Sequence, residues 1–118
     1  MDTDMQIEIR GHIKATDAIR DHIDRRLRTA IGRFGHRVRS VTIRLDDING
    51  PARGGNDKAC HIEAVLDSPR RNPVVVEEVH ADLYSAITRA AERLSVAVRR
   101  ELDRLRHPPR ERSSATAS

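Results

Sequence analysis

The sequence is nearly without aromatic side chains, since its 118 residues contain no Trp, one Tyr and one Phe. Proteins that read single-stranded RNA on a sheet or an OB barrel stack successive bases on aromatic rings. Phe34 continues an apolar helical stripe, and Tyr84 lies in the first turn of a predicted helix, so both are expected to pack within the protein. An aromatic platform for bases is therefore excluded, whereas phosphate contacts and recognition of RNA shape are not.

Cysteine and long apolar runs are scarce as well. Cys60 is the single cysteine, so no internal disulfide can form, and nothing indicates an oxidising compartment. No run approaches the roughly 18 apolar residues of a membrane span, and the opening MDTDMQIEIRG lacks the apolar segment of a signal peptide. We therefore expect a cytoplasmic protein with no membrane segment.

Clusters of catalytic or metal-binding residues are also missing. Cys60 and His61 are adjacent in a predicted strand and point to opposite faces, and the other histidines are scattered, so neither a metal nor a cofactor is expected. The acidic pairs at residues 46–47 and 77–78 lie in predicted strands, where alternation separates the two carboxylates of each pair. The sequence therefore predicts a protein that is not an enzyme.

Positive charge, by contrast, is abundant. Lys and Arg number 22 against 18 Asp and Glu, which gives a net charge of +4 at pH 7. Nearly all of the positive charge is Arg, whose forked guanidinium suits contacts with phosphate. Such a balance indicates anionic partners, with nucleic acid first among them.

Hydrophobic periodicity divides the chain into six elements. Alternating apolar residues predict strands at residues 5–11, 40–48, 60–67 and 73–81. Apolar residues at helical spacing predict a helix that begins after the cap Thr16 and ends near Gly32 and Gly35, and a second helix from the cap Asp82 to about His107. The residues expected to point inward from the two middle strands are Val41, Ile43, Leu45, Cys60, Ile62, Ala64 and Leu66.

These elements predict an α+β fold ordered β-α-β-β-β-α. Each strand alternates and so needs only one buried face, which two amphipathic helices on one side of a four-stranded sheet provide. The chain is long enough for one modest core. We expect a single domain at residues 1–107 and a disordered tail at residues 108–118, which begins with the two prolines that stop the second helix.

Arginines line the predicted outward faces of both helices at 100° per residue. On the first helix, Asp21 and Asp24 are expected toward the opposite flank from the basic residues. A row of one sign mildly destabilises a helix, whereas paired charges at i,i+4 would support it by about 0.3 kcal/mol each. An anionic partner explains such rows better than a solvated face, which remains the ordinary alternative. The two rows are His22, Arg25, Arg26, Arg28 and Arg33 on the first helix, and Arg89, Arg93, Arg100 and Arg104 on the second.

The stretch NGPARGGNDK, residues 49–58, is a loop by composition, because Asn-Gly, Gly-Pro and Gly-Gly favour turns. Its glycines and basic residues invite comparison with a phosphate-binding loop. It departs from the P-loop pattern, since Asn56 stands where lysine is required and no helix start follows. A plain hairpin connection is the simpler interpretation, with Arg53 and Lys58 as additional candidate RNA contacts.

Several segments, in their order and spacing, carry a family resemblance. They are the opening MQIEIRG, the helix start TDAIRDHIDRRL, the ending RRELDRLRH, and a strand-to-helix junction with His80, Asp82, Tyr84, Ala86 and Ile87. From about residue 5 to residue 107 the chain resembles the short ribosome hibernation factors, the ribosome-associated inhibitor and hibernation-promoting proteins once called sigma-54 modulation proteins.

The resemblance implies the β-α-β-β-β-α fold and a function. Members bind the small ribosomal subunit, place basic helix residues against ribosomal RNA, and occupy the path of mRNA and tRNA. The chain is similar to short members, which lack a C-terminal ribosome-dimerising domain. It differs from relatives at Val79 and Val96, where basic residues are common. By position, the family's basic residues correspond to Arg20, Arg26, Arg93 and Arg100.

Two other functions remain open. The sheet face left uncovered by the helices could be an interaction module that contacts a protein partner or gives weak self-association through Arg10, Arg44, His61, Glu63 and Val65. A basic RNA chaperone that acts away from the ribosome is the third hypothesis, and it would bind unrelated structured RNAs with equal affinity.

Overall fold

The computed structural model describes residues 6–48, 57–68 and 73–106. Within them the chain forms, in order, β1 (Gln6–Gly11), α1 (Asp17–Ile31), the short 3-10 helix η1 (Gly32–Arg37), β2 (Val38–Asp47), β3 (Lys58–Leu66), β4 (Val74–His80) and α2 (Leu83–Arg106). The predicted order β-α-β-β-β-α is confirmed. The expected tail at residues 108–118 lies outside the described residues.

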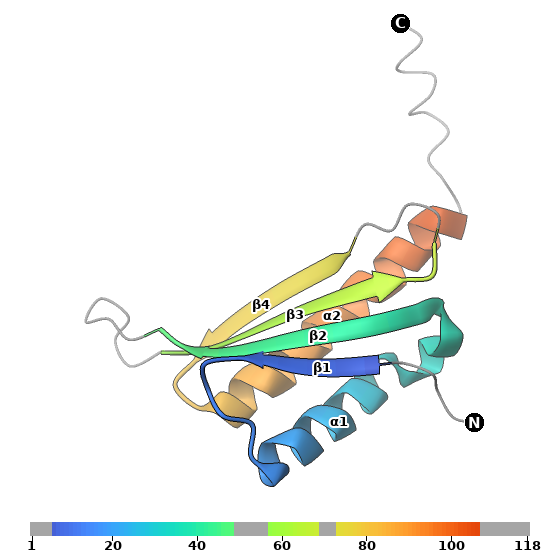
Figure 1. The fold of residues 1–118 in the computed structure, drawn as a ribbon. Coiled ribbons are helices and arrows are strands. Elements are labelled where there is room, and N and C mark those ends of the chain that lie inside the picture. The colour runs from blue at the N-terminus through green and yellow to red at the C-terminus, as the bar shows by residue number, and fades with distance from the viewer. Residues whose placement is uncertain (1–5, 49–56, 69–72, 107–118) are drawn as a thin grey trace, which may run out of the picture.

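The four strands form one sheet in the order β1-β2-β3-β4. β1 runs parallel to β2, and the remaining neighbours are antiparallel. A parallel pair needs a crossover connection, and α1 provides it. Both helices lie on the same face of the sheet, α1 beneath β1 and β2 and α2 beneath β3 and β4 (Figure 1), so the opposite face is open.

The core lies between the sheet and the helices, as the alternation predicted. All seven predicted inward residues of β2 and β3 are at most 1% exposed. Apolar residues at helical spacing are buried on both helices. They are Ile19, Ile23, Leu27, Ala30 and Ile31 on α1, and Ala86, Ile87, Ala90, Ala91, Leu94, Val98 and Leu102 on α2. Strand β2 begins at Val38, two residues earlier than predicted, and Val38 is itself buried.

Both predicted helix caps are present. The Thr16 hydroxyl accepts a hydrogen bond from the backbone N–H of Ile19 at 3.3 Å. The Asp82 carboxylate accepts one from the backbone N–H of Ser85 at 3.0 Å and another from its hydroxyl at 2.8 Å. These bonds lower the pKa of Asp82. Each cap satisfies donors that the first turn of a helix leaves without an intrahelical acceptor.

Gly11 ends β1 in a conformation that other residues rarely adopt. Its φ is +107°, and a Cβ at this position would lie 2.2 Å from the backbone oxygen of Leu45 in β2. The same oxygen accepts the N–H of Ile13 at 3.1 Å. Glycine is therefore required here, because the chain leaves the sheet pressed against its neighbouring strand.

Candidate nucleic-acid interface

The exposed surface of the two helices carries arginines in two electrostatic states. Within the described ranges, one group has no carboxylate within 4.0 Å of its guanidinium groups and is called here the free arginines. A second group forms ion pairs with carboxylates of the same chain and is called the paired arginines. The free arginines are Arg20, Arg25, Arg26, Arg89, Arg99, Arg100 and Arg106, and the paired arginines are Arg28, Arg93 and Arg104.

The prediction that arginines and acids lie on separate flanks of the helices is wrong for the paired arginines. On α1, the Nε of Arg28 lies 2.9 Å from a carboxylate oxygen of Asp24, one turn earlier. On α2, an Nη of Arg104 lies 3.2 Å from a carboxylate oxygen of Glu101. Both arginine side chains are more than half exposed. Such pairs are weak, at about 0.2–1 kcal/mol, so they reduce the local positive charge without fixing the side chains.

Arg93 is held more firmly than the other paired arginines. Its Nη1 donates to the Glu78 carboxylate and to the Glu77 backbone carbonyl, both at 2.9 Å. Both acceptors belong to β4, so Arg93 lies on the flank of α2 that faces β4. Because β4 and α1 lie on opposite sides of α2 (Figure 1), this guanidinium points away from α1.

His22 was predicted on the outward face of the first helix, but it lies between the two helices. It is partly buried, and its Nε2 lies 3.0 Å from the Thr88 hydroxyl and 3.2 Å from the backbone carbonyl of Tyr84. A carbonyl only accepts, so Nε2 carries the proton. The ring of Tyr84 packs edge-on to the imidazole with centroids 4.9 Å apart. Tyr84 therefore packs as expected, although 38% of it stays exposed.

Arg33 lies in η1 and not on the first helix, where it was predicted, and it contacts α2. Its guanidinium donates to the Ser95 hydroxyl at 3.2 Å and lies 5.3 Å from the centroid of the Phe34 ring. Phe34 is partly buried and packs against the core from η1, so it continues the apolar stripe past the end of α1. Arg33 keeps its charge uncompensated by acid among the described residues, but a hydroxyl and a ring fix its direction.

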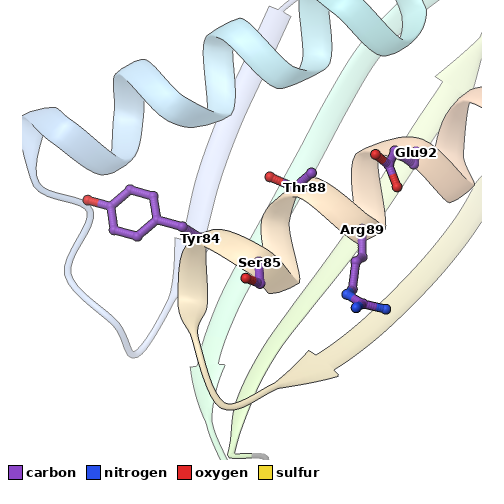
Figure 2. Close-up of a pocket in the computed structure, with 5 residues that line it drawn as sticks. All are labelled: Tyr84, Ser85, Thr88, Arg89 and Glu92. Atoms are coloured by element: carbon purple, nitrogen blue, oxygen red, sulfur yellow. The ribbon is translucent and has the colours of Figure 1, made fainter.

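Two hollows lie along the helix layer and share Thr88 and Glu92. The first has a volume of about 470 Å³ and is lined from α2 alone, with Arg89 at one side. Figure 2 shows Tyr84 pointing toward α1 and Arg89 pointing the other way, out over the strands. The second, of about 220 Å³, lies between the helices and is lined by Arg26, Thr29, Ala30, Thr88, Ala91, Glu92 and Ser95.

Arg53 and Lys58 are the candidate RNA contacts from the stretch at residues 49–58. Arg53 lies outside the described residues. Lys58 is the first residue of β3, and its ammonium lies 3.2 Å from carboxylates of both Asp47 and Asp57. These hydrogen bonds raise the pKa of Lys58. Its charge is therefore compensated by two acids of the same chain, which sequence composition did not indicate.

The open sheet face mixes both signs of charge. One row crosses all four strands, with Arg10 beside Arg44, Arg44 beside His61, and His61 beside Glu77. Arg10 pairs with Glu8 at 2.9 Å and Arg44 with Asp46 at 3.0 Å. Positive charge on this face is thus largely offset by neighbouring acids, in contrast to the free arginines of the helix layer.

Metal binding, a reactive cysteine and a membrane-spanning helix have little support among the residues that the structure describes. No group of three or more His, Cys, Asp or Glu side chains there is placed to hold a metal ion. Cys60 is fully buried, and burial raises the pKa of its thiol to about 12. No helix in the described ranges is long and apolar enough to cross a membrane.

The fold and this surface define a class: a two-layer α+β domain whose helix layer presents free arginines. The model of the family described as sigma 54 modulation protein / S30EA ribosomal protein matches residues 6–106. The chain belongs to this family, as its segments indicated.

Individual relatives agree with this assignment. A ribosome hibernation promotion factor from Bacillus subtilis is 30% identical over 112 residues, which are 93% of this chain and 55% of the relative. The chain thus spans about half the length of that relative. The N-terminal domain of Thermus thermophilus Protein Y is 29% identical, with a TM-score of 0.61 over 85% of this chain and 98% of that one. A ribosomal subunit interface protein from Coxiella burnetii has the same fold at 15% identity, with a TM-score of 0.62 over 84% and 99% of the two chains.

One basic residue of the surface escaped the sequence prediction. Arg99 is exposed and belongs to the free arginines. On a helical wheel it lies about 80° from Arg89, outside the predicted row and toward α1. Only the packing of α1 against α2 makes this side part of a shared surface.

Proposed function

We propose that this chain is a non-enzymatic, cytoplasmic factor that associates with ribosomes. It binds RNA of the small subunit through its helix layer and inhibits translation by occupying the path of mRNA and tRNA. Family membership and the hibernation function named for the Bacillus subtilis relative support a ribosomal partner. The observation that carries the proposed surface is the set of free arginines on two adjacent helices.

Uncompensated positive charge drives binding in this proposal. Arg25 and Arg26 of α1 and Arg89 and Arg100 of α2 are exposed and have no carboxylate partner among the described residues. Each guanidinium that neutralises a phosphate releases condensed counterions, which drives binding. Arginine adds forked hydrogen bonds to this charge. Structured RNA presents phosphates over a broad surface, so arginines on two adjacent helices can contact it together.

The other predicted arginines have secondary roles in this proposal. Arg28 and Arg104 are partly neutralised by ion pairs with acids of their own helices, so they add little to RNA binding in this proposal. Arg20 lies on α1 about 120° around the helix from Arg26, at the rim of the surface. Arg33 and Arg93 are positioned by contacts within the protein. Arg53 and Lys58 are additional candidate RNA contacts in this proposal.

A displacement experiment tests this function. Purified small subunits carrying a fluorescent mRNA are titrated with the wild-type protein, which is expected to release the mRNA. The double variant Arg25→Ala with Arg100→Ala is expected to lose this activity. Arg10→Ala with Arg44→Ala removes the same charge from the open sheet face and is expected to displace mRNA like the wild type. Equal loss in both variants would mean that net charge, not the helix surface, governs binding.

The salt dependence of binding gives the second arm of the test. The slope of log affinity against log salt is expected to fall in magnitude by roughly 0.7–0.9 for each phosphate contact removed. The helix double variant should therefore lose between one and two units of slope. Equal affinity for the small subunit and for unrelated structured RNAs would instead support an RNA chaperone.

A protein-interaction function of the open sheet face is the second candidate. Val75 on this face is 49% exposed, and a hollow of about 430 Å³ lined by both arginines and carboxylates lies beside it. Self-association that resists salt, measured by sedimentation velocity without any binding to ribosomes, would favour this function. Val75→Asp would then abolish the association.

A further inference from the structure

We propose that Arg26 and Glu92 together recognise an unpaired guanine of the bound RNA, at the hollow between α1 and α2. This inference rests on the proposed RNA-binding function, because it names a base that the same surface selects. The Glu92 carboxylate has no cationic partner among the described residues and lines this hollow together with Arg26. Glu92 lines both hollows of the helix layer and is exposed.

Among the described acids of the two helices that pair with no cation, Glu92 is the one that lines the hollow between α1 and α2. Asp24, Glu78 and Glu101 each pair with an arginine at 3.2 Å or less. Within the described part of the chain no cation lies within 4.0 Å of Glu92, although Arg89 precedes it by three residues and Arg26 lines the same hollow. A free negative charge at this place repels phosphate. The group that docks here is therefore not the RNA backbone but something that donates hydrogen bonds.

The chemistry of the pair selects one base. An ionised carboxylate only accepts hydrogen bonds, and a guanidinium only donates them. Guanine alone carries two adjacent donors, N1–H and the N2 amino group, on its Watson–Crick edge, and two adjacent acceptors, O6 and N7, on the next edge. Arginine binding to O6 and N7 is a common specific contact in nucleic-acid recognition. Glu92 and Arg26, on facing sides of one hollow, match the two edges.

The remaining lining fits the flat body of a base. Ala30 and Ala91 are small and almost fully buried, and they come from the two facing helices. Thr29 and Ser95 add hydroxyls, which donate or accept as needed. The hollow of about 220 Å³ adjoins the larger one through Thr88 and Glu92. A base in a duplex uses its Watson–Crick edge for pairing, so the recognised guanine is in a loop, a bulge or an end.

The test measures base discrimination by the full-length protein. Four labelled RNA hairpins differ only in a single-nucleotide bulge, which is G, A, C or U. The wild type is expected to bind the G bulge roughly tenfold more tightly than the others, the scale of one good bidentate contact. Glu92→Gln keeps the side-chain volume and removes the charge. It is expected to bind all four hairpins more tightly and to lose the preference for G.

Base analogues assign the two contacts separately. Inosine lacks the N2 amino group, and its substitution for guanine should weaken binding by the wild type but not by Glu92→Gln. Replacement of guanine by 7-deazaguanine removes N7 and should weaken binding by the wild type but not by Arg26→Ala. Asp103→Asn is the matched control, because Asp103 is an exposed acid of α2 that lines neither hollow. This variant should retain the preference for G.

The outcomes separate this inference from the function on which it rests. Equal affinity of the wild type for all four bulges, with binding still lost in the Arg25 and Arg100 variant, overturns guanine recognition and leaves RNA binding intact. Retention of the G preference by Glu92→Gln also overturns it. Failure of the wild type to bind small subunits at all overturns the proposed function itself.

Discussion

The guanidinium of Arg93 in α2 lies 2.9 Å from the carboxylate of Glu78 in β4. Arg100, two turns further along the same helix, is exposed and has no carboxylate partner among the described residues. The two residues have the same chemistry and were predicted to share one row. Tertiary packing separates them into an arginine that joins helix to sheet and an arginine that is available to a partner.

This difference predicts opposite effects of two single substitutions. Arg93→Ala should lower the free energy of unfolding by up to about 1 kcal/mol, because an ion pair and a backbone contact are lost, and it should change RNA affinity little. Arg100→Ala should leave stability unchanged and weaken RNA binding severalfold. Urea titration and fluorescence anisotropy measure the two quantities. The same loss of affinity in both variants would mean that RNA binding releases Arg93 from β4.

Gly11 should be the least replaceable glycine of the described residues. Gly11→Ala would place a Cβ at 2.2 Å from the Leu45 oxygen and would strain a φ of +107°. The free energy of unfolding should fall by at least about 2 kcal/mol. Gly32→Ala is the matched control, because its Cβ meets nothing within 4 Å and its φ is −60°. That substitution should be neutral or slightly stabilising; similar losses at both positions would contradict the close approach of β1 and β2.

Asp46 should contribute stability that depends on pH. Its carboxylate accepts hydrogen bonds from the backbone and side chain of His12, and these contacts, aided by Arg44, hold its pKa below the ordinary value of 3.8. A depressed pKa in the folded state gives stability that is present above the ordinary pKa and is lost as the pH falls through the folded value. The wild type should therefore exceed Asp46→Asn in stability at neutral pH, and the difference should disappear in strong acid. A difference that persists unchanged below pH 3 would contradict this role.

Cys60 should report unfolding. Burial raises the pKa of its thiol to about 12, so almost no reactive thiolate exists at pH 8. Ellman's reagent should leave the native protein unmodified and label one thiol per chain in urea. Rapid labelling of the native protein would show that the layer between β3 and the helices opens readily.

Much of the fold was predictable because each strand and helix covers one side of a single core. Alternation identified the inward residues of β2 and β3, and helical spacing identified most of the buried residues of both helices. The caps Thr16 and Asp82 were visible because capping depends on side chains within three residues of the helix start. The requirement for glycine at position 11 was not visible, because the atoms that exclude a side chain belong to Leu45, 34 residues later.

The surface was only partly predictable. A helical wheel gives the direction of each side chain from its own helix but not the atoms that a neighbouring element places there. For this reason the outward assignment of His22 was wrong, and the ion pairs of Arg93 and Lys58 with residues of other segments were not foreseen. Arg99 was missed for the same reason, because it belongs to the surface shared by the two helices only when α1 packs beside α2. Arg25, Arg26, Arg89 and Arg100 were identified correctly as exposed basic residues, because no described residue forms a hydrogen bond or an ion pair with their guanidinium groups.

Co-sedimentation with purified small ribosomal subunits tests the central claim most directly, if two charge-matched triple variants are compared. One replaces the free arginines Arg26, Arg89 and Arg100 with Ala, and the other replaces the paired arginines Arg28, Arg93 and Arg104. Circular dichroism confirms that both variants are folded. We predict that the first variant stays in the supernatant while the second pellets with the subunits. Pelleting of the first variant at the wild-type level would contradict the claim that uncompensated arginines of the helix layer bind the ribosome.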